Sequence, residues 1–266
     1  MGLGVTSNSI MTDGKTAVQQ RKKPRHWALE GTLSLVSALL FVLAIRSTFI
    51  EPFKIPSGSM IPTLYVGDQI FVNKASYGLR VPFTDWIGEK PRYFFHFDPP
   101  KRGDIIVFKY PVDPDFYYIK RIVGTPGDTV EVRNKEVFIN GQALERKPVE
   151  QAKVDEIFKD LENNPRYPKE EMTVMYEKFR DDKTGIIMED RRAYSFAANQ
   201  APTKIPENKY FVMGDNRDDS QDSRFWGFVD FDQIKGRAVV IWLSIWLDFD
   251  QSSMTFRPER IGTILK

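Results

Sequence analysis

The sequence predicts a mainly β protein, in which an N-terminal transmembrane helix is followed by an all-β core that carries an inserted α+β or β lobe. Three observations lead to this fold class. An apolar run at residues 31–45 follows a basic cluster at residues 21–25. Short strand-like runs bounded by Gly, Pro, Asn and Asp then recur along much of the chain. A charge-rich stretch from about residue 144 to 205 interrupts them without sustained alternation of its own.

The composition fits a folded protein and removes several kinds of chemistry. With 266 residues, 41% hydrophobic and 28% charged, the chain can bury a substantial core. A net charge of +2 gives no reason to expect a nucleic-acid partner. The lack of cysteine excludes disulfides, thiol nucleophiles and Cys-ligated zinc, and it suits an oxidising compartment. No metal or cofactor is indicated.

The apolar run predicts a single membrane crossing. Flanking apolar residues extend it to residues 27–50, and its charges, Glu30 and Arg46, lie near the ends, where they can reach the interface. The basic cluster predicts that residues 1–26 form a cytoplasmic tail and that the chain beyond residue 50 lies outside. A cleaved signal peptide has the same layout, but no small-x-small site follows Ile45. A buried core helix would leave the basic cluster unexplained.

Strand patterns fill most of the chain after the helix. They occur at residues 69–73, 104–110, 117–123, 129–133, 136–139, 209–213 and 237–246. Asn140-Gly141 is a hairpin signal, and residues 78–100 are expected to be irregular. We therefore assign residues 51–143 and 206–266 to one β domain and residues 144–205 to the inserted charged lobe. Trp242 and Trp246 share a strand face that either contacts lipid or packs in the β core.

One stretch between the helix and the first long strand is suited to present a nucleophile. Ser57 and Ser59 flank Gly58, with Pro56 before them and Pro62 after. The prolines hold the segment in extended, non-helical geometry, so the serines sit on a stiff platform. Such positioning accounts for much of catalysis. The alternative is an ordinary surface turn, since these residue types are common in turns.

A serine nucleophile needs a base, and the two histidines are poor candidates. His26 is expected across the membrane from Ser59, and His96 falls in an aromatic, Pro-flanked run expected to be a loop. A lysine that burial has deprotonated is the next candidate. By strand alternation Lys120 shares a face with Tyr118 and an aliphatic neighbour. The alternative is a solvated strand lysine.

The polar run at residues 214–224 is dense in Asp, Ser and Arg. It fails the EF-hand pattern, since position six counted from Asp218 is Ser223 rather than Gly. It is either a plain Asx-rich turn or a source of hydroxyl and carboxylate partners around a site.

Together these stretches resemble the bacterial type I signal peptidases, which are membrane-bound Ser/Lys peptidases. The family's serine box is matched by residues 55–64 (IPSGSMIPTL) and its lysine box by residues 118–128 (YIKRIVGTPGD). A third box is matched by residues 213–224 (MGDNRDDSQDSR), and a further stretch by residues 236–242 (GRAVVIW). The order, the spacing and the preceding membrane segment agree with the family.

The resemblance implies a role for each matched residue. Ser59 is the nucleophile, Lys120 is the general base and later the acid, and the Ser57 hydroxyl with the Ser59 N–H forms the oxyanion hole. Ser220 is expected to hydrogen-bond and orient the lysine ammonium. The other implied residues are the supporting Asp222, Arg224, Asp215 and Arg217 and the substrate-binding Phe53, Ile55, Pro56, Tyr118 and Ile119.

The resemblance also implies the substrate and the location. The expected reaction is endoproteolysis after a small-x-small (Ala-x-Ala) site in exported preproteins, without metal or cofactor. The expected setting is the bacterial inner (cytoplasmic) membrane, with the catalytic domain on its outer side near the secretion translocon. The alternatives are a related Ser/Lys processing peptidase with other clients, such as an organellar one, and a catalytically silent anchored binding protein. A penicillin-binding-type acyl enzyme is excluded because no Ser-x-x-Lys occurs.

Overall fold

The computed structural model describes residues 26–84, 90–161, 164–193, 196–248 and 253–265. The chain divides into two units, residues 1–42 and 43–266. The basic cluster at residues 21–25 and the cytoplasmic tail predicted before residue 26 lie outside the described residues, apart from His26 itself.

Helix α1 (His26–Thr48) coincides with the predicted membrane segment. Its stretch Leu29–Thr48 spans 20 residues with a mean hydropathy of 1.7, and its apolar side chains are largely exposed. A helix of that length measures about 30 Å, the thickness of a bilayer core. Exposed leucines on all sides of a helix are unfavourable in water, so the helix is suited to lipid.

The described part of the larger unit is built on an eight-stranded antiparallel sheet, which confirms the predicted β class. The strand order is β1-β2-β16-β5-β6-β14-β15, and β17 pairs with β16. The bounds are β1 (Ile50–Lys54), β2 (Asp68–Asn73), β5 (Ile105–Lys109), β6 (Tyr117–Gly124), β14 (Lys209–Met213), β15 (Val229–Asp230), β16 (Ile234–Asp248) and β17 (Ser253–Phe256). β6 is therefore a central strand, hydrogen-bonded to β5 on one side and β14 on the other.

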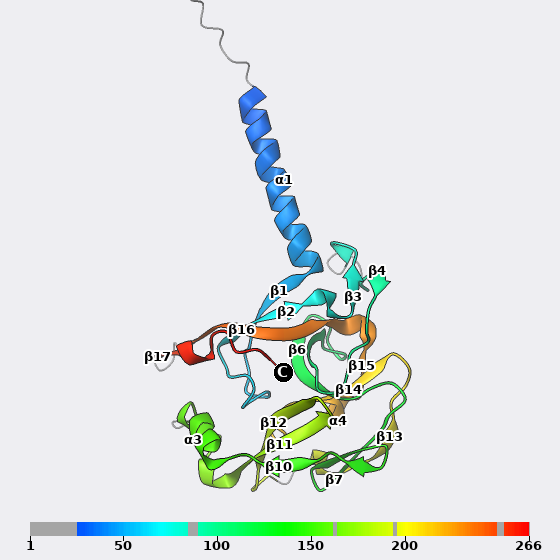
Figure 1. The fold of residues 1–266 in the computed structure, drawn as a ribbon, viewed down its shortest axis with the longest axis vertical. Coiled ribbons are helices and arrows are strands. Elements are labelled where there is room, and N and C mark those ends of the chain that lie inside the picture. The colour runs from blue at the N-terminus through cyan, green and yellow to red at the C-terminus, as the bar shows by residue number, and fades with distance from the viewer. Residues whose placement is uncertain (1–25, 85–89, 162–163, 194–195, 249–252, 266) are drawn as a thin grey trace, which may run out of the picture. The chain divides into compact units, whose positions relative to one another are not determined.

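Three smaller sheets complete the β structure, in the orders β10-β11-β12, β13-β7-β8-β9 and β3-β4. Their bounds are β3 (Gly78–Arg80), β4 (Tyr93–His96), β7 (Thr129–Arg133), β8 (Glu136–Ile139), β9 (Gln142–Ala143), β10 (Arg146–Pro148), β11 (Met172–Arg180), β12 (Lys183–Asp190) and β13 (Gln200–Lys204). The short helices are α3 (Gln151–Lys159) and α4 (Ser223–Trp226). In Figure 1, β10–β12 lie next to β7 and β13, away from β1, β2 and β16.

One apolar cluster joins the predicted lobe to the serine stretch. Ile61 and Tyr65 pack with buried residues of α3, β11 and β12 and with Tyr167. A second cluster, under β1, β2 and β16, contains Ile55 and Ile119. The serine stretch therefore lies between two cores, and burial on both sides fixes its position.

One sequence expectation differs from the structure. The stretch 78–100 holds the paired strands β3 and β4, so His96 ends a strand instead of lying in a loop. The charged stretch 144–205 holds α3 and the strands β11 and β12, which are nine and eight residues long, as expected for an α+β lobe, although its sequence showed no sustained alternation. Its alternation was obscured because Glu177, a charged residue, occupies a fully buried strand position. The domain boundaries given above stay a prediction.

Candidate active site

Ser59 lies in a turn segment between β1 and β2 and is 7% exposed. The polar run after β14 holds this turn by its backbone. Asn216 donates its N–H to the Ser59 carbonyl at 3.1 Å and its side-chain amide to the Gly58 carbonyl at 3.1 Å. Gly214 makes this close approach feasible, because a Cβ there would collide with the Ser59 carbonyl and the Ser220 side chain. Residues more than 150 positions apart in the sequence thus fix the serine.

Lys120 reaches this serine from the middle of the main sheet. Its Nζ donates to Ser59 Oγ at 2.5 Å, and the residue is 4% exposed. The ammonium lies 5.6 Å from the centre of the Tyr118 ring. Because the side chain is buried against the serine turn, water has little access to the nitrogen.

Burial lowers the pKa of Lys120 from its ordinary value to about 8. Desolvation is the largest cause, since an ammonium loses its hydration in the core. Asp222 and Asp215 act in the opposite direction, and Arg224 lowers the pKa further. A lysine so placed is partly neutral near pH 8 and can accept a proton from a hydroxyl at hydrogen-bond distance.

Ser220 and Asp222 form a rigid support beside the lysine. The Ser220 hydroxyl donates to Asp222 Oδ2 at 2.8 Å, and the Gly214 N–H donates to the same oxygen at 3.0 Å. Arg224 Nε pairs with Asp222 Oδ1 at 2.8 Å. Burial by itself raises the pKa of Asp222, but Arg224 and these hydrogen bonds outweigh it and the pKa is lowered. The Ser220 hydroxyl therefore binds the carboxylate that raises the pKa of Lys120.

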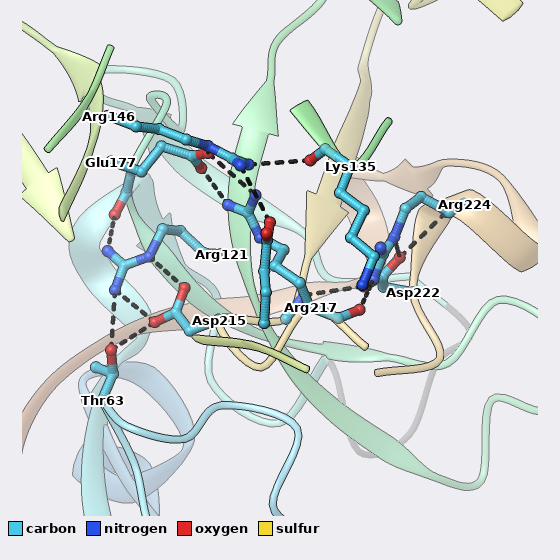
Figure 2. Close-up of polar contacts among 12 residues, drawn as sticks. Thr63, Arg121, Lys135, Arg146, Glu177, Asp215, Arg217, Asp222 and Arg224 are labelled. Carbon is cyan, nitrogen blue, oxygen red and sulfur yellow. Dashed lines mark hydrogen bonds and ion pairs between the residues drawn. The ribbon is translucent and has the colours of Figure 1, made fainter. Parts of the chain in front are cut away.

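Two further ion pairs fasten the polar run to the strands. Figure 2 shows Arg121 facing Asp215 and Thr63, with Arg121 Nε 2.8 Å from Asp215 Oδ1. Arg217 pairs with Glu177 of β11. All four charged residues of these pairs are at most 2% exposed. These contacts support the structural role expected for Asp215 and Arg217.

Ser59 and Lys120 lie in an open cleft of about 770 Å³. Its lining consists of Pro56, Ser57, Gly58, Ser59, Ile61, Val66, Tyr117, Tyr118, Ile119, Lys120, Asn164, Arg166, Tyr167, Asp218, Asp219, Ser220, Gln221 and Phe225. The structure thus brings Ser57, Pro56, Tyr118 and Ile119 to the site. Phe53 and Ile55 belong instead to the neighbouring core, where Ile55 is 2% exposed.

Sequence reasoning did not single out Asn164, Arg166 and Tyr167, which reach the cleft from the charged stretch. The sequence of this turn has no motif that predicts a site. The three residues become part of the cleft only because the fold packs Tyr167 against Gly58. Within the described residues, no cluster of three or more His, Cys, Asp or Glu side chains could hold a metal ion.

The chain is similar to known peptidases. The family model described as signal peptidase, peptidase S26, matches residues 27–243. A signal peptidase I of Pseudomonas fluorescens is 38% identical over 79% of this chain and 71% of its own length. The signal peptidase I of Pseudomonas aeruginosa is 35% identical over 93% and 83%, and that of Haemophilus influenzae is 37% identical over 95% and 81%. A solved signal peptidase I from Enterococcus faecalis is 28% identical and covers 53% of this chain and 97% of its own, with a TM-score of 0.30.

Proposed function

Because this chain belongs to the signal peptidase family, peptidase S26, we propose that it removes signal peptides from exported preproteins with Ser59 as nucleophile and Lys120 as general base. One observation carries the mechanism. The Lys120 Nζ lies 2.5 Å from Ser59 Oγ, in a buried position that opens onto a cleft.

The first half of the reaction acylates Ser59. Neutral Lys120 accepts the Ser59 proton as Oγ bonds to the scissile carbonyl carbon. The carbonyl oxygen becomes an oxyanion, for which the Ser57 hydroxyl and the Ser59 N–H are the proposed donors. One such donor is worth about 2.7–4 kcal/mol when preorganised. Protonated Lys120 then gives its proton to the leaving amine as the C–N bond breaks.

The second half of the reaction hydrolyses the ester between Ser59 and the substrate. A water molecule attacks the ester carbonyl while neutral Lys120 takes one of its protons, and the proton returns to Ser59 Oγ as the C–O bond breaks. The hydrogen-bonded pair of Ser220 and Asp222 packs beside Lys120 and keeps its side chain in position during both halves of the reaction. A lysine base needs no carboxylate to select a tautomer, unlike a histidine.

We infer that the substrates carry small residues at the first and third positions before the cut. Pro56, Tyr118 and Ile119 form an apolar wall of the cleft, which suits small, uncharged side chains. Phe53 and Ile55, which lie in the core beside it, support that wall. A model preprotein with Ala at both positions should be cleaved, and Phe or Lys at either should strongly impair cleavage. Equal rates for all three residues would refute this specificity.

The membrane arrangement is proposed from α1 and the basic residues before it. We expect the N-terminus in the cytoplasm, a single crossing of the inner membrane and the catalytic unit on the outer side, near the translocon that delivers its substrates. Protease added from the outer side should degrade most of the chain. Protection of residues beyond 50 from that side would overturn the orientation.

The direct test is incubation of detergent-solubilised protein with a model preprotein. The wild type should release the signal peptide, whereas Ser59→Ala and Lys120→Arg should not, since arginine stays protonated. His96→Ala should retain activity, because no proposed step uses it. A silent binding protein would leave the preprotein intact in every case, and a processing peptidase with other clients would cleave only after different sequences.

A further inference from the structure

The catalytic cleft has two chemically different sides. Pro56, Tyr118 and Ile119 make one side apolar. Polar residues from the turn at residues 164–167 and the run at residues 218–221 line another part of it, here called the polar side. Because the proposed function assigns the small residues before the cut to the apolar side, the polar side remains for the chain beyond the scissile bond.

Tyr167 fixes the polar side against the serine stretch. Its hydroxyl donates to Asp219 Oδ2 at 2.5 Å, and the residue is 5% exposed within the cluster that contains Ile61. The hydroxyl also lies against Gly58, since a Cβ at that glycine would collide with it. The polar side is therefore held at a set distance from Ser59.

Arg166 is the exposed charge on this side. Its guanidinium pairs with Asp219, and its side chain is 67% exposed while that of Asp219 is 25% exposed. The turn itself is preorganised, because Asn164 accepts the Arg166 N–H at 3.1 Å through its side chain and the Tyr167 N–H at 3.0 Å through its carbonyl. A guanidinium carries five N–H donors, so pairing with one carboxylate leaves it able to bind another.

We propose that Arg166, with Tyr167 and Asp219 holding it in place, contacts the one or two substrate residues that follow the scissile bond and favours acidic side chains there over basic ones. The inference rests on the proposed function and specifies its substrate class further.

The preference for acidic over basic residues follows from the exposure and the hydrogen bonding of the charged groups. The Asp219 carboxylate is less exposed than Arg166 and already pairs with it and with Tyr167. Asp218, the other carboxylate in the lining, is 5% exposed and pairs with Lys135, so a lysine on the substrate gains little from either. An incoming carboxylate meets the more exposed guanidinium first. An exposed ion pair contributes about 0.2–1 kcal/mol, which corresponds to a rate preference of about 1.5- to fivefold.

The test uses three peptides that are identical up to the cut and carry two Ala, two Asp or two Lys residues directly after it. kcat/KM is measured for the detergent-solubilised full chain and for Arg166→Gln and Arg166→Glu. Lys147→Glu is the matched control. It reverses a charge on a side chain of the same stretch that is 72% exposed and does not line the cleft.

The wild type should cleave the Asp peptide about 1.5 to five times faster than the Lys peptide. Arg166→Gln should bring the ratio close to one, Arg166→Glu should invert it, and Lys147→Glu should keep the wild-type ratio. The preference should also weaken in 0.5 M salt, which screens exposed charges. Lys147→Glu should also cleave the Ala peptide at the wild-type rate.

An unchanged ratio in both Arg166 variants would overturn the inference while leaving the proposed function intact. An equal response to Lys147→Glu would overturn it too, because the effect would then come from net charge. If the wild type cleaves none of the three peptides, the proposed function fails and the inference fails with it.

Discussion

Replacing Lys120 by Met should lower kcat/KM strongly, and the pH dependence of the wild type should show why. With a pKa of about 8, roughly 10% of Lys120 is neutral at pH 7, compared with about 0.03% for a lysine of ordinary pKa. Burial therefore increases the competent fraction about 300-fold. The wild-type kcat/KM should rise with pH and level off above about pH 8.

Lys235→Met is the matched control for this substitution. Lys120 and Lys235 are both 4% exposed, and each nitrogen lies near a tyrosine ring, at 5.6 and 5.4 Å from its centre. The two lysines differ in that Lys120 donates a hydrogen bond to Ser59. Lys120→Met should lower kcat/KM by about 10²–10⁴-fold, the usual contribution of a general base, whereas Lys235→Met should keep most of the rate.

The assay is the initial rate of cleavage of a fluorogenic peptide with an Ala-x-Ala site between pH 6 and 10. Circular dichroism establishes that each variant is folded. Comparable losses in both lysine variants would show that burial of a lysine, not the contact with the serine, governs activity. A wild-type profile that is flat from pH 6 to 9 would refute a lysine base with this pKa.

Three further outcomes follow from the same contacts. The folded state releases the Lys120 proton at about pH 8, so the free energy of unfolding of the wild type should rise between pH 8 and pH 10.5. At pH 7 the free energy of unfolding of Lys120→Met should exceed that of the wild type by up to about 3 kcal/mol. This difference, measured by urea denaturation, should disappear by pH 10.5. Arg217→Leu leaves buried Glu177 without its main partner and should cost about 3–5 kcal/mol, whereas the same change at half-exposed Arg192 should cost at most about 1 kcal/mol. Gly214→Ala should lower kcat strongly and change KM little, because the new Cβ would collide with the carbonyl of Ser59, the proposed nucleophile. An unchanged kcat would contradict that packing.

Local patterns in the sequence were sufficient for the membrane helix and most strands of the main sheet. The apolar run at residues 31–45 needs no tertiary partner to be recognised, and α1 covers it. The runs at residues 117–123 and 209–213 carry enough β-branched and aromatic residues to predict β6 and β14. The serine, lysine and third boxes are short contiguous stretches, so they could be recognised in the sequence. Their resemblance to the family predicted that Ser59, Lys120 and Ser220 would lie close together.

Only the tertiary structure decided the environment of those residues. Strand alternation predicted an apolar face for Lys120, but its burial depends on the serine turn, which brings Ser59 Oγ to 2.5 Å from the Lys120 Nζ. A glutamate is normally expected at the surface, but Glu177 is buried in the fold, where it pairs with Arg217. Arg166 and Asp219, 53 positions apart, meet at the cleft through packing that no local pattern encodes. Desolvation, ion pairing and cleft shape all depend on long-range contacts, so the folded chain alone determines them.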